Sequence, residues 1–258
     1  MNGRTFAAAA CCWLLAATAA LAPASADDLA RRAGFDQNLG RVIPRELAFR
    51  NEQGRDVRLG DYLGSAPVVL AFAYYGCSTL CPAVIGNLAD TLGRSGLEPG
   101  AQYRVVVVSI DPGDSPALAA RSKAVYLQHA SAAAGAWHLL TGSDRSIAAI
   151  TGAAGFRYAY DGATHQYAHP AGIVLLTPSG RIARYFFGFD FTPTALKSGI
   201  EDASGESIGA PAARLLLLCF HFDPAGRYSA AILQALRLAA LAMLAAALAW
   251  AAFRLRDR

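Results

Sequence analysis

The chain has 258 residues, enough for one large domain or one domain with short additions at its ends. Hydrophobic residues make up 54% and charged residues 16% of the sequence, and the net charge is +4. The positive charges are scattered, without a lysine- or arginine-rich block or basic residues interleaved with aromatic ones. We therefore expect no binding to nucleic acid.

The N-terminus, residues 1–26, has the pattern of a signal peptide. Arg4 is followed by an apolar stretch over residues 6–22 and then by small residues that end at Ala26. A charged start, an apolar centre and an A-x-A ending are typical of an export signal that is removed. We expect cleavage after Ala26, and a retained N-terminal anchor is the alternative.

The C-terminus predicts a membrane-spanning helix over residues 230–253, which are rich in alanine and leucine. A spanning helix needs about 20 apolar residues. The tail, residues 254–258, carries three arginines, which mark the cytoplasmic side of a span. Together the two ends predict a single-pass protein of the cytoplasmic (inner) membrane with its functional domain in the periplasm. The alternative is an amphipathic or buried helix of a soluble protein.

Between these ends we expect a flexible segment (27–45), a globular domain (46–205) and a juxtamembrane segment (206–229). Buried runs and turn residues predict a hairpin at 47–59, turning at Gln53-Gly54, and another at 172–187. Further strands are expected at 67–74, 103–110 and 137–140, and helices at 82–92, 117–133, 145–152 and 193–203. Strands that alternate with helices and end in a hairpin predict an α/β fold with a mixed central sheet flanked by helices.

Two of the five cysteines, Cys77 and Cys81, form a C-x-x-x-C-P motif with Pro82. The motif follows an apolar strand and Gly76, and it leads into a helix. At a helix N-terminus the exposed N–H groups and the helix dipole favour thiolate over thiol. A spacing of four on a helical turn brings the two Cβ atoms to about 5–6 Å. At that spacing the sulfurs can form a disulfide or bind one metal ion.

Three interpretations of the motif remain open on this basis. A structural disulfide would close a very short loop and would restrict the unfolded chain little. A dithiol redox centre normally has the spacing C-x-x-C, one residue shorter than here. A metal site needs at least one further ligand.

A histidine before the strand at 172–176 is the candidate for that ligand. His165 and His169 flank a predicted loop there, and loops at strand ends carry sites on α/β sheets. His129 and His138 lie in or beside regular elements and are expected to be surface or core residues. Two thiolates and one imidazole form a soft site that suits Cu(I), and imidazole also suits Cu(II). Zinc prefers four protein ligands, and the sequence offers no evident fourth.

The chain resembles the SCO/SenC family of copper-binding, thioredoxin-like proteins. The resemblance covers about residues 40–205 and is carried by three motifs in the same order: Cys77 to Pro82, the S-x-D-P turn at 109–112, and His169 followed by a strand and the hairpin at 178–181.

The resemblance implies a thioredoxin-like fold in which Cys77, Cys81 and His169 bind copper. It also implies a role in assembling the binuclear copper centre of cytochrome c oxidase. The partners expected are the copper-bearing oxidase subunit, another copper chaperone or a thioredoxin-like reductase, and the membrane. Two features depart from the family: Ala168 stands where many members have Asp, and the predicted anchor is C-terminal rather than N-terminal.

We therefore expect a metallochaperone rather than an enzyme, with a Cys77–Cys81 disulfide as its unloaded state. The main alternative is a thiol–disulfide oxidoreductase that reduces the oxidase cysteines and has no need of His169. A peroxiredoxin-type peroxidase is disfavoured because no Pro-Thr pattern precedes Cys77. Cys219 and His221 form a candidate auxiliary metal site. Its alternative is that Cys219 packs at the membrane interface and His221 is solvated.

Overall fold

The computed structural model describes residues 32–77, 80–162, 164–189, 191–212, 218–219, 237–243 and 245–246. It divides into two compact units, residues 1–219 and 220–258. In the second unit the described residues are helical. No helix among the described residues is long and apolar enough to cross a membrane. The predicted signal peptide (1–26) and tail (254–258), and most of the predicted span (230–253), lie outside the described residues.

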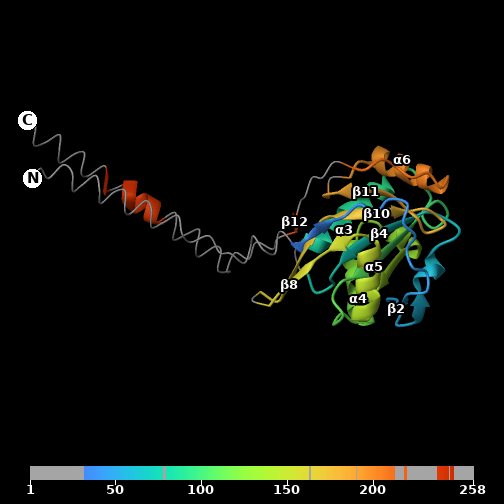
Figure 1. Cartoon of the computed structure of the whole chain (residues 1–258), viewed down its shortest axis with the longest axis horizontal. Coiled ribbons are helices and arrows are strands. Elements are labelled where there is room, and N and C mark those ends of the chain that lie inside the picture. The colour runs from blue at the N-terminus through green and yellow to red at the C-terminus, as the bar shows by residue number, and fades with distance from the viewer. Residues whose placement is uncertain are drawn as a thin grey trace, which may run out of the picture. The chain divides into compact units, whose positions relative to one another are not determined.

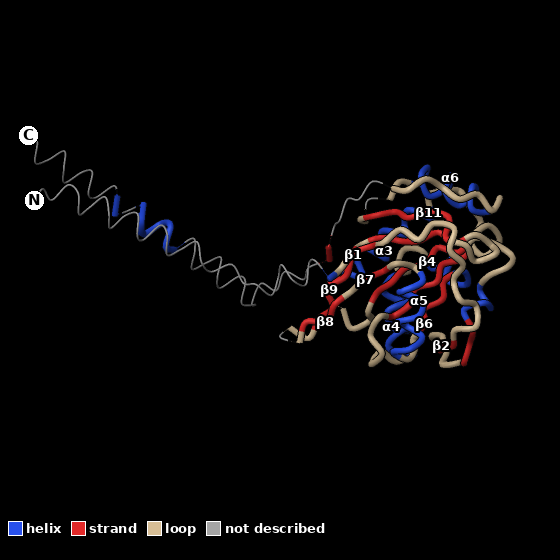
Figure 2. The backbone as a smooth tube through the Cα atoms, viewed as in Figure 1, coloured by secondary structure: helices blue, strands red, loops and turns tan. Residues whose placement is uncertain are grey.

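The first unit is built on a five-stranded mixed sheet (Figures 1 and 2). Across the sheet the strands are β11 (Ile182–Phe187), β10 (Gly172–Leu176), β4 (Val68–Ala73), β5 (Arg104–Ser109) and β6 (Trp137–Leu140). Strands β4, β5 and β6 are parallel to one another. Strand β10 is antiparallel to both β4 and β11. This arrangement confirms the predicted α/β class and the predicted closing hairpin.

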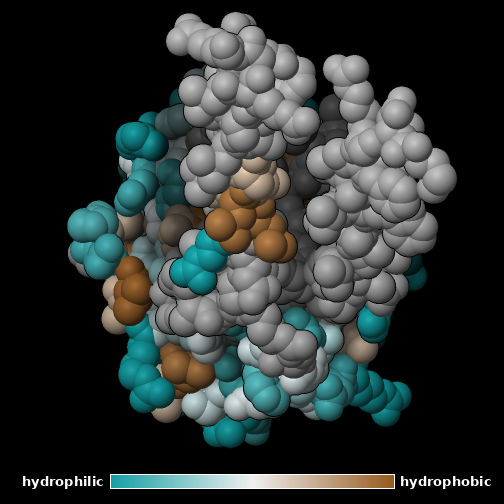
Figure 3. Space-filling view, turned by 90° about the vertical axis from the view of Figure 1, so that its left-hand side faces the viewer, coloured by the Kyte–Doolittle hydropathy of each residue, from teal (hydrophilic) through white to brown (hydrophobic). Residues whose placement is uncertain are grey.

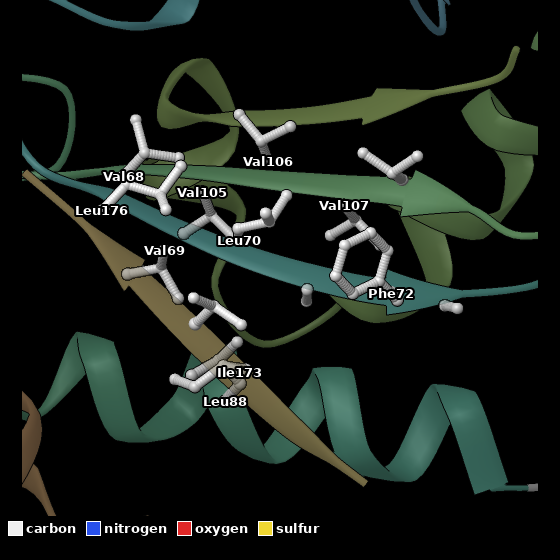
Figure 4. Close-up of a cluster of buried hydrophobic side chains, with 14 of the residues drawn as sticks. Val68, Val69, Leu70, Phe72, Leu88, Val105, Val106, Val107, Ile173 and Leu176 are labelled. Carbon is white, nitrogen blue, oxygen red and sulfur yellow. The ribbon is translucent and has the colours of Figure 1, made fainter. Parts of the chain in front are cut away.

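The central strands are fully buried because their sequences do not alternate between apolar and polar residues. All six residues of β4 are buried, as are the last five of β5. A strand buried on both faces is typical of a sheet covered by helices. Figure 4 shows side chains of β4, β5 and β10 packing together, with Leu88 of helix α3 against them. The core therefore lies at the strand that leads into the cysteine motif.

Among the described residues, four α-helices pack around this sheet (Figure 1). They are α3 (Leu80–Gly93), α4 (Pro116–Tyr126), α5 (Asp144–Ala153) and α6 (Pro193–Ser204). Ser115, Ser143 and Thr192 cap α4, α5 and α6, each accepting a hydrogen bond from a backbone N–H three residues later. Such caps satisfy N–H groups that have no partner within the helix.

Helix α4 ends seven residues earlier than the sequence predicts. It stops at Tyr126, and a separate 3-10 helix, η2 (Ser131–Ala136), follows. The connection must return the chain to the start of β6. An 11-residue helix is about 16 Å long, close to the length of a six-residue strand, whereas 17 helical residues would overshoot it by several ångströms. Helix propensity, a property of the local sequence, does not indicate where α4 must end for the chain to reach β6.

The segment expected to be flexible, residues 27–45, is partly built into the fold. Strand β1 (Gly34–Phe35) pairs with β7 (Phe156–Arg157). The Phe35 ring contacts the rings of Phe156, Tyr185 and Phe187, with centroids 5.2–5.6 Å apart. Burial of these rings offsets the entropy cost of ordering the chain.

Two further small sheets complete the unit. The predicted N-terminal hairpin is confirmed as β2 (Ala48–Arg50) and β3 (Asp56–Arg58), followed by the 3-10 helix η1 (Leu59–Tyr62). Strands β8 (Ala159–Asp161), β9 (Gln166–Pro170) and β12 (Leu218–Cys219) form a three-stranded antiparallel sheet with β9 in the middle. Strand β9 of this sheet lies beside β1 and β7 (Figure 2).

In the view of Figure 3 the described hydrophobic residues form one small group near the centre and otherwise lie singly among hydrophilic ones. In the first unit the exposed large hydrophobic residues that the structure describes are Val42, Val125, Tyr160 and Phe189. Single exposed apolar residues are normal on soluble domains.

His138 on β6 gives the domain a predictable dependence on pH. Burial lowers the pKa of His138 from its usual 6.5 to about 4, partly opposed by the charge of Glu52 and assisted by Lys123 and Arg104. The unfolded chain therefore takes up a proton between about pH 6.5 and 4 that the folded chain does not. We expect the free energy of unfolding to fall across that window by about 2 kcal/mol from this residue, allowing for its partial exposure.

Denaturant unfolding at a series of pH values measures this effect. His138→Phe keeps an aromatic ring against Tyr62, whose centroid is 4.5 Å from that of His138. The variant should lose this part of the pH dependence. If it shows the same slope as the unaltered protein between pH 4 and 6.5, His138 is not the titrating group.

Candidate metal centre

The candidate centre is formed where the start of α3 meets β9. The Cys81 Sγ and the His169 Nε2 are 3.9 Å apart, although 88 residues separate them in sequence. Both side chains are buried, at 3% and 4% exposure. They also line one small pocket. An ion about 2.3 Å from the sulfur and about 2.0 Å from the nitrogen would join these atoms at an angle of about 130°. The two ligands are therefore correctly spaced for a single metal ion.

The hydrogen bond made by the His169 side chain determines that the ring nitrogen facing Cys81 carries no hydrogen. His169 Nδ1 lies 3.0 Å from the backbone oxygen of Pro170. A carbonyl oxygen only accepts, so Nδ1 donates and Nε2 keeps its lone pair in the neutral ring. An imidazole held by its other nitrogen is the usual arrangement of a metal-binding histidine. The tautomer thus suits coordination through Nε2.

Burial also favours the neutral form of His169. Burial is the largest influence and lowers the pKa of His169, while the Pro170 carbonyl and the charge of Cys77 act in the opposite direction. The rings of Tyr74 and Phe156 lie 6.2 and 5.9 Å from the imidazole, measured between centroids. These apolar walls exclude water, and a neutral imidazole is the form that binds metal.

The residues around His169 form a strand and not the predicted loop. His165 lies at the β8–β9 turn with a φ of 55°, and residues 166–170 form β9. Pairing with β8 and β12 fixes the direction in which His169 projects. Tyr167, on the same strand, is held by a hydrogen bond to Asp111; burial first and then the charge of Asp111 raise the pKa of Tyr167 to about 12. The S-x-D-P turn therefore supports the strand that carries the histidine.

Gly172 allows β10 to begin close to this strand. Its φ is +152°, and a Cβ atom there would lie 2.5 Å from the backbone oxygen of Phe186 and 3.1 Å from a ring carbon of Phe35. No side chain fits in that space. The glycine lets the chain pass from His169 straight into the central sheet.

The turn before Cys77 is anchored by Tyr75. The Tyr75 hydroxyl lies 2.9 and 3.0 Å from the backbone oxygens of Val107 and Leu140, which share its one hydrogen. The Tyr75 N–H donates to Asp114 Oδ2 at 2.7 Å. These bonds tie the end of β4 to β5 and β6. They fix the position from which the chain enters the cysteine motif, and no sequence pattern beyond an apolar run indicated them.

Asp114 connects that turn to the S-x-D-P segment. Besides the Tyr75 N–H, it accepts a hydrogen bond from the Ser109 hydroxyl at 2.5 Å. Burial raises the pKa of Asp114, and the bonds from Ser109 and Tyr75 partly offset that rise. Asp114 does not cap α4, because Ser115 takes that role. Asp114 is therefore a positioning residue for the cysteine loop.

We expect Asp114→Ala to lower the free energy of unfolding by about 1–3 kcal/mol, because the buried Tyr75 N–H loses its acceptor. Asp114→Asn keeps an acceptor oxygen and should retain most of the stability. Denaturant unfolding of both variants measures the difference. Equal losses in the two variants would show that the charge of Asp114, rather than its acceptor geometry, supports the turn.

Cys77 lies outside α3, in the turn that precedes it. Its N–H donates to the Tyr74 oxygen at 3.2 Å, and the helix begins at Leu80. Cys81 is in the first turn of α3, and residues 78 and 79, which join it to Cys77, lie outside the described residues. Both cysteines are in the thiol form, Cys81 buried and Cys77 half-buried. Within the described ranges, no three side chains of His, Cys, Asp or Glu already form a metal site.

The other sequence candidates take separate places. His165 is on the β8–β9 turn, with its Nδ1 2.9 Å from the Tyr160 hydroxyl. His138 is a half-buried residue of β6, as expected for a core histidine. Cys219 pairs through its backbone with His169. His221 lies outside the described residues.

One neighbour of the thiols was missed by the sequence analysis. Tyr126, the last residue of α4, is buried at 3% exposure. Burial first, and then the charges of Cys81 and Cys77, raise its pKa. The phenol therefore stays protonated beside the two sulfurs. It could not be recognised in the sequence, because its position depends on where α4 ends.

The model of the SCO1/SenC family matches residues 37–203, about two thirds of the chain. The chain belongs to the SCO1/SenC family. The match includes both cysteines of the motif and His169, so the two residues that the fold brings together are within the family region. No match was found among curated proteins.

Solved structures with the same fold agree with this membership. A candidate electron transfer protein from Aquifex aeolicus VF5 is 22% identical, with a TM-score of 0.58 over 65% of this chain and 95% of its own. ScoI of Arabidopsis thaliana, solved with copper bound, is 17% identical, with a TM-score of 0.52 over 65% and 99%. BsSco, described as having a disulfide switch and as a member of the Sco family of cytochrome c oxidase assembly proteins, is 22% identical, with a TM-score of 0.52 over 67% and 98%. At these identities the likeness shows the fold of this SCO1/SenC protein.

Proposed function

We propose that this SCO1/SenC protein is a membrane-tethered periplasmic copper chaperone that helps to assemble the binuclear copper centre of cytochrome c oxidase. The observation that carries the proposal is the 3.9 Å approach of Cys81 Sγ to His169 Nε2, with the imidazole hydrogen directed away. Family membership and the copper-bound Arabidopsis thaliana relative support it. The description of BsSco as a member of a family of cytochrome c oxidase assembly proteins supports the oxidase as the acceptor of the copper.

Different residues of the site would hold the copper ion and release it. Buried Cys81 and His169 form the fixed part of the site. Cys77 is half-buried on the turn before α3, where a partner can reach it. A thiol of the acceptor would displace Cys77 first and the buried ligands later. Soft sulfur ligands make Cu(I) the preferred cargo, and the imidazole also accommodates Cu(II).

Metal loading requires both cysteines to be reduced. A ligating sulfur must be a thiolate, and a disulfide cannot supply one. We expect the reduced full-length protein to bind one Cu(I) and the Cys77–Cys81 disulfide form to bind none. Titration of both forms against a coloured Cu(I) chelator measures this. Binding that is equal in the oxidised protein would overturn the proposed site.

A second candidate function is a thiol–disulfide oxidoreductase acting on the oxidase cysteines. The half-buried Cys77 beside the buried Cys81 favours it, because reactive thiols are partly accessible and need a resolving partner. This function does not need His169. Full reductase activity in a His169→Ala variant that binds no copper would favour the oxidoreductase over the chaperone.

We propose that the chain is exported and held at the inner membrane by residues 230–253, with its C-terminus in the cytoplasm. The signal pattern of residues 1–26 and the arginines of residues 254–258 support this orientation. Protease treatment of spheroplasts should degrade the domain from outside. Protection of the domain until the membrane is dissolved would place it in the cytoplasm.

A further inference from the structure

The buried hydroxyl of Tyr126 has no hydrogen-bond partner of ordinary geometry in the described part of the chain. Tyr126 is the last residue of α4 and is 3% exposed. Burial raises the pKa of Tyr126, and the Ser122 hydroxyl one turn earlier opposes that rise without forming an ordinary hydrogen bond. A buried donor without an acceptor costs free energy and is rare in folded proteins. A partner that forms only when the site changes its state would explain why the core keeps this hydroxyl.

The packing of α4 against α3 directs the Tyr126 ring toward Cys81. The two helices follow the parallel strands β4 and β5, so both begin at the same end of the sheet. A Cβ atom on Gly86 would lie 3.8 Å from the backbone oxygen of Tyr126, which is therefore beside the second turn of α3. A helical side chain points back toward the start of its own helix. The ring is thus directed toward the first turn of α3, which carries Cys81.

The turn before Cys77 is linked to the same part of α4. The Ser122 hydroxyl lies 3.5 Å from the backbone oxygen of Tyr75, two residues before Cys77. Tyr126 and Cys81 belong to one buried cluster, and Cys77 packs against it. After burial, the charges of Cys81 and then of Cys77 raise the pKa of Tyr126. The phenol therefore lies near both sulfurs and keeps its hydrogen when they are thiolates.

We propose that Tyr126 is a positioning residue of the metal centre, whose hydroxyl donates a hydrogen bond to the Cys81 sulfur when that sulfur is a thiolate. The inference rests on the proposed copper-binding function, in which the ligating sulfurs are thiolates. A hydroxyl hydrogen rotates to suit its acceptor, and hydrogen bonds to a charged acceptor are stronger than those to a neutral one. The bond therefore favours the reduced, metal-loading form of the pair over the Cys77–Cys81 disulfide.

Reduction of the disulfide by glutathione is the step in which this preference appears. The Cys77–Cys81 bond breaks, one S–S bond forms between two glutathione molecules, and two electrons and two protons pass to the protein sulfurs. A proton that then leaves Cys81 goes to solvent. Without the Tyr126 hydroxyl the thiolate product is less stable, whereas the disulfide is unaffected. We expect Tyr126→Phe to lower the equilibrium constant for reduction about tenfold, which corresponds to about 30 mV.

Equilibration of the full-length protein with glutathione buffers, followed by a count of free thiols, measures this constant. The sequence has five cysteines, so Cys11, Cys12 and Cys219 are replaced by serine in every protein compared. The Cu(II) form gives a second measurement. Its sulfur-to-copper absorption band should move to longer wavelength in Tyr126→Phe, because a sulfur without the hydrogen bond gives up charge more readily. A residue that only fills the core would change neither result.

Tyr103→Phe is the matched control. Tyr103 is fully buried, and its hydroxyl also has no partner in the described structure, but it precedes β5 at the opposite end of the sheet. Its replacement should leave the equilibrium constant and the absorption band unchanged. Both variants keep the aromatic ring and remove only an unpartnered hydroxyl, so both should fold with at least the stability of the parent protein.

The outcomes separate this inference from the proposed function. If the parent protein binds one Cu(I) and Tyr126→Phe changes neither the constant nor the band, only the role of Tyr126 is wrong. An equal shift in Tyr103→Phe would show a general effect of losing a buried hydroxyl and would also overturn the inference. If the reduced parent protein binds no copper, the proposed function itself fails, and the glutathione equilibrium still decides whether Tyr126 stabilises the thiolate.

Discussion

Replacing His169 by alanine should lower the Cu(I) affinity at least about 100-fold, more than the loss usually seen when only a supporting residue of a metal site is changed. His169 supplies the nitrogen that faces Cys81, and its ring is fixed by the bond to the Pro170 oxygen. No described imidazole other than His169 lines the pocket with Cys81. Competition titration against a coloured Cu(I) chelator measures the change. The Cu(II) form should also lose its nitrogen ligand in electron paramagnetic resonance spectra.

His165→Ala is the matched control for this variant. His165 is four residues away in the same hairpin, but it lies on the exposed turn and contacts Tyr160. Its removal should leave the affinity and the spectra unchanged. Because His169 is buried, the His169→Ala protein must first be shown to unfold cooperatively. A folded His169→Ala protein with unchanged copper affinity and unchanged Cu(II) spectra would rule out His169 as a ligand.

Replacing Lys123 by methionine should lower the free energy of unfolding by about 3–5 kcal/mol, because it leaves a buried carboxylate without its counter-charge. The Glu52 side chain is 5% exposed and that of Lys123 is 17% exposed, and their charged atoms lie 2.5 Å apart. Glu52 also accepts a hydrogen bond from the Leu139 N–H at 3.1 Å. Burial acts to raise the pKa of Glu52, but these partners outweigh it and the pKa is lowered. Glu52 therefore remains charged at neutral pH.

Denaturant unfolding of three proteins tests this expectation. Lys197→Met is the matched control, because Lys197 forms an exposed pair with Glu201 at 4.0 Å on α6 and its loss should cost about 0.5 kcal/mol or less. Adding Glu52→Gln to Lys123→Met removes the unpaired charge and should recover part of the stability. A loss below about 1 kcal/mol in Lys123→Met would show that water reaches Glu52 and that the pair is not a buried one.

The Glu52–Lys123 pair also bears on how the fold holds the site. Glu52 precedes β3, Lys123 is on α4, and Leu139 is on β6. The pair therefore joins the N-terminal hairpin to the helix whose last residue, Tyr126, lies beside the cysteines. We expect variants at Lys123 to lower stability without changing the ligands of the site. Copper stoichiometry should stay at one per folded protein.

Local sequence was sufficient to predict the elements that present the motif. The valine-rich run of β5 and the unbroken apolar run of β4 are buried on both faces, and only a covered sheet buries a strand in that way. The expected starts of α4 and α6, at residues 117 and 193, agree with the structure to within one residue, because a proline and the Ser115 or Thr192 cap before it act within one turn of the chain. Cys77 and Cys81 were identified from spacing, since they are neighbours in sequence.

Tertiary structure decided what the motif faces. His165 and His169 were both candidates from their place before a strand, and the family resemblance singled out His169. Its 3.9 Å approach to Cys81 depends on β9 pairing with β8 and β12, which no local pattern encodes. Asp114 is the acceptor for the Tyr75 N–H because the ends of β4 and β5 meet in the folded sheet, although the two residues are 39 apart in sequence. The chain returns after α6, and the backbone of Cys219 then pairs with that of His169. The sequence by itself determined which groups can bind copper, and the long-range pairing of strands decided which of them lie together, because those contacts join residues that are far apart in the chain.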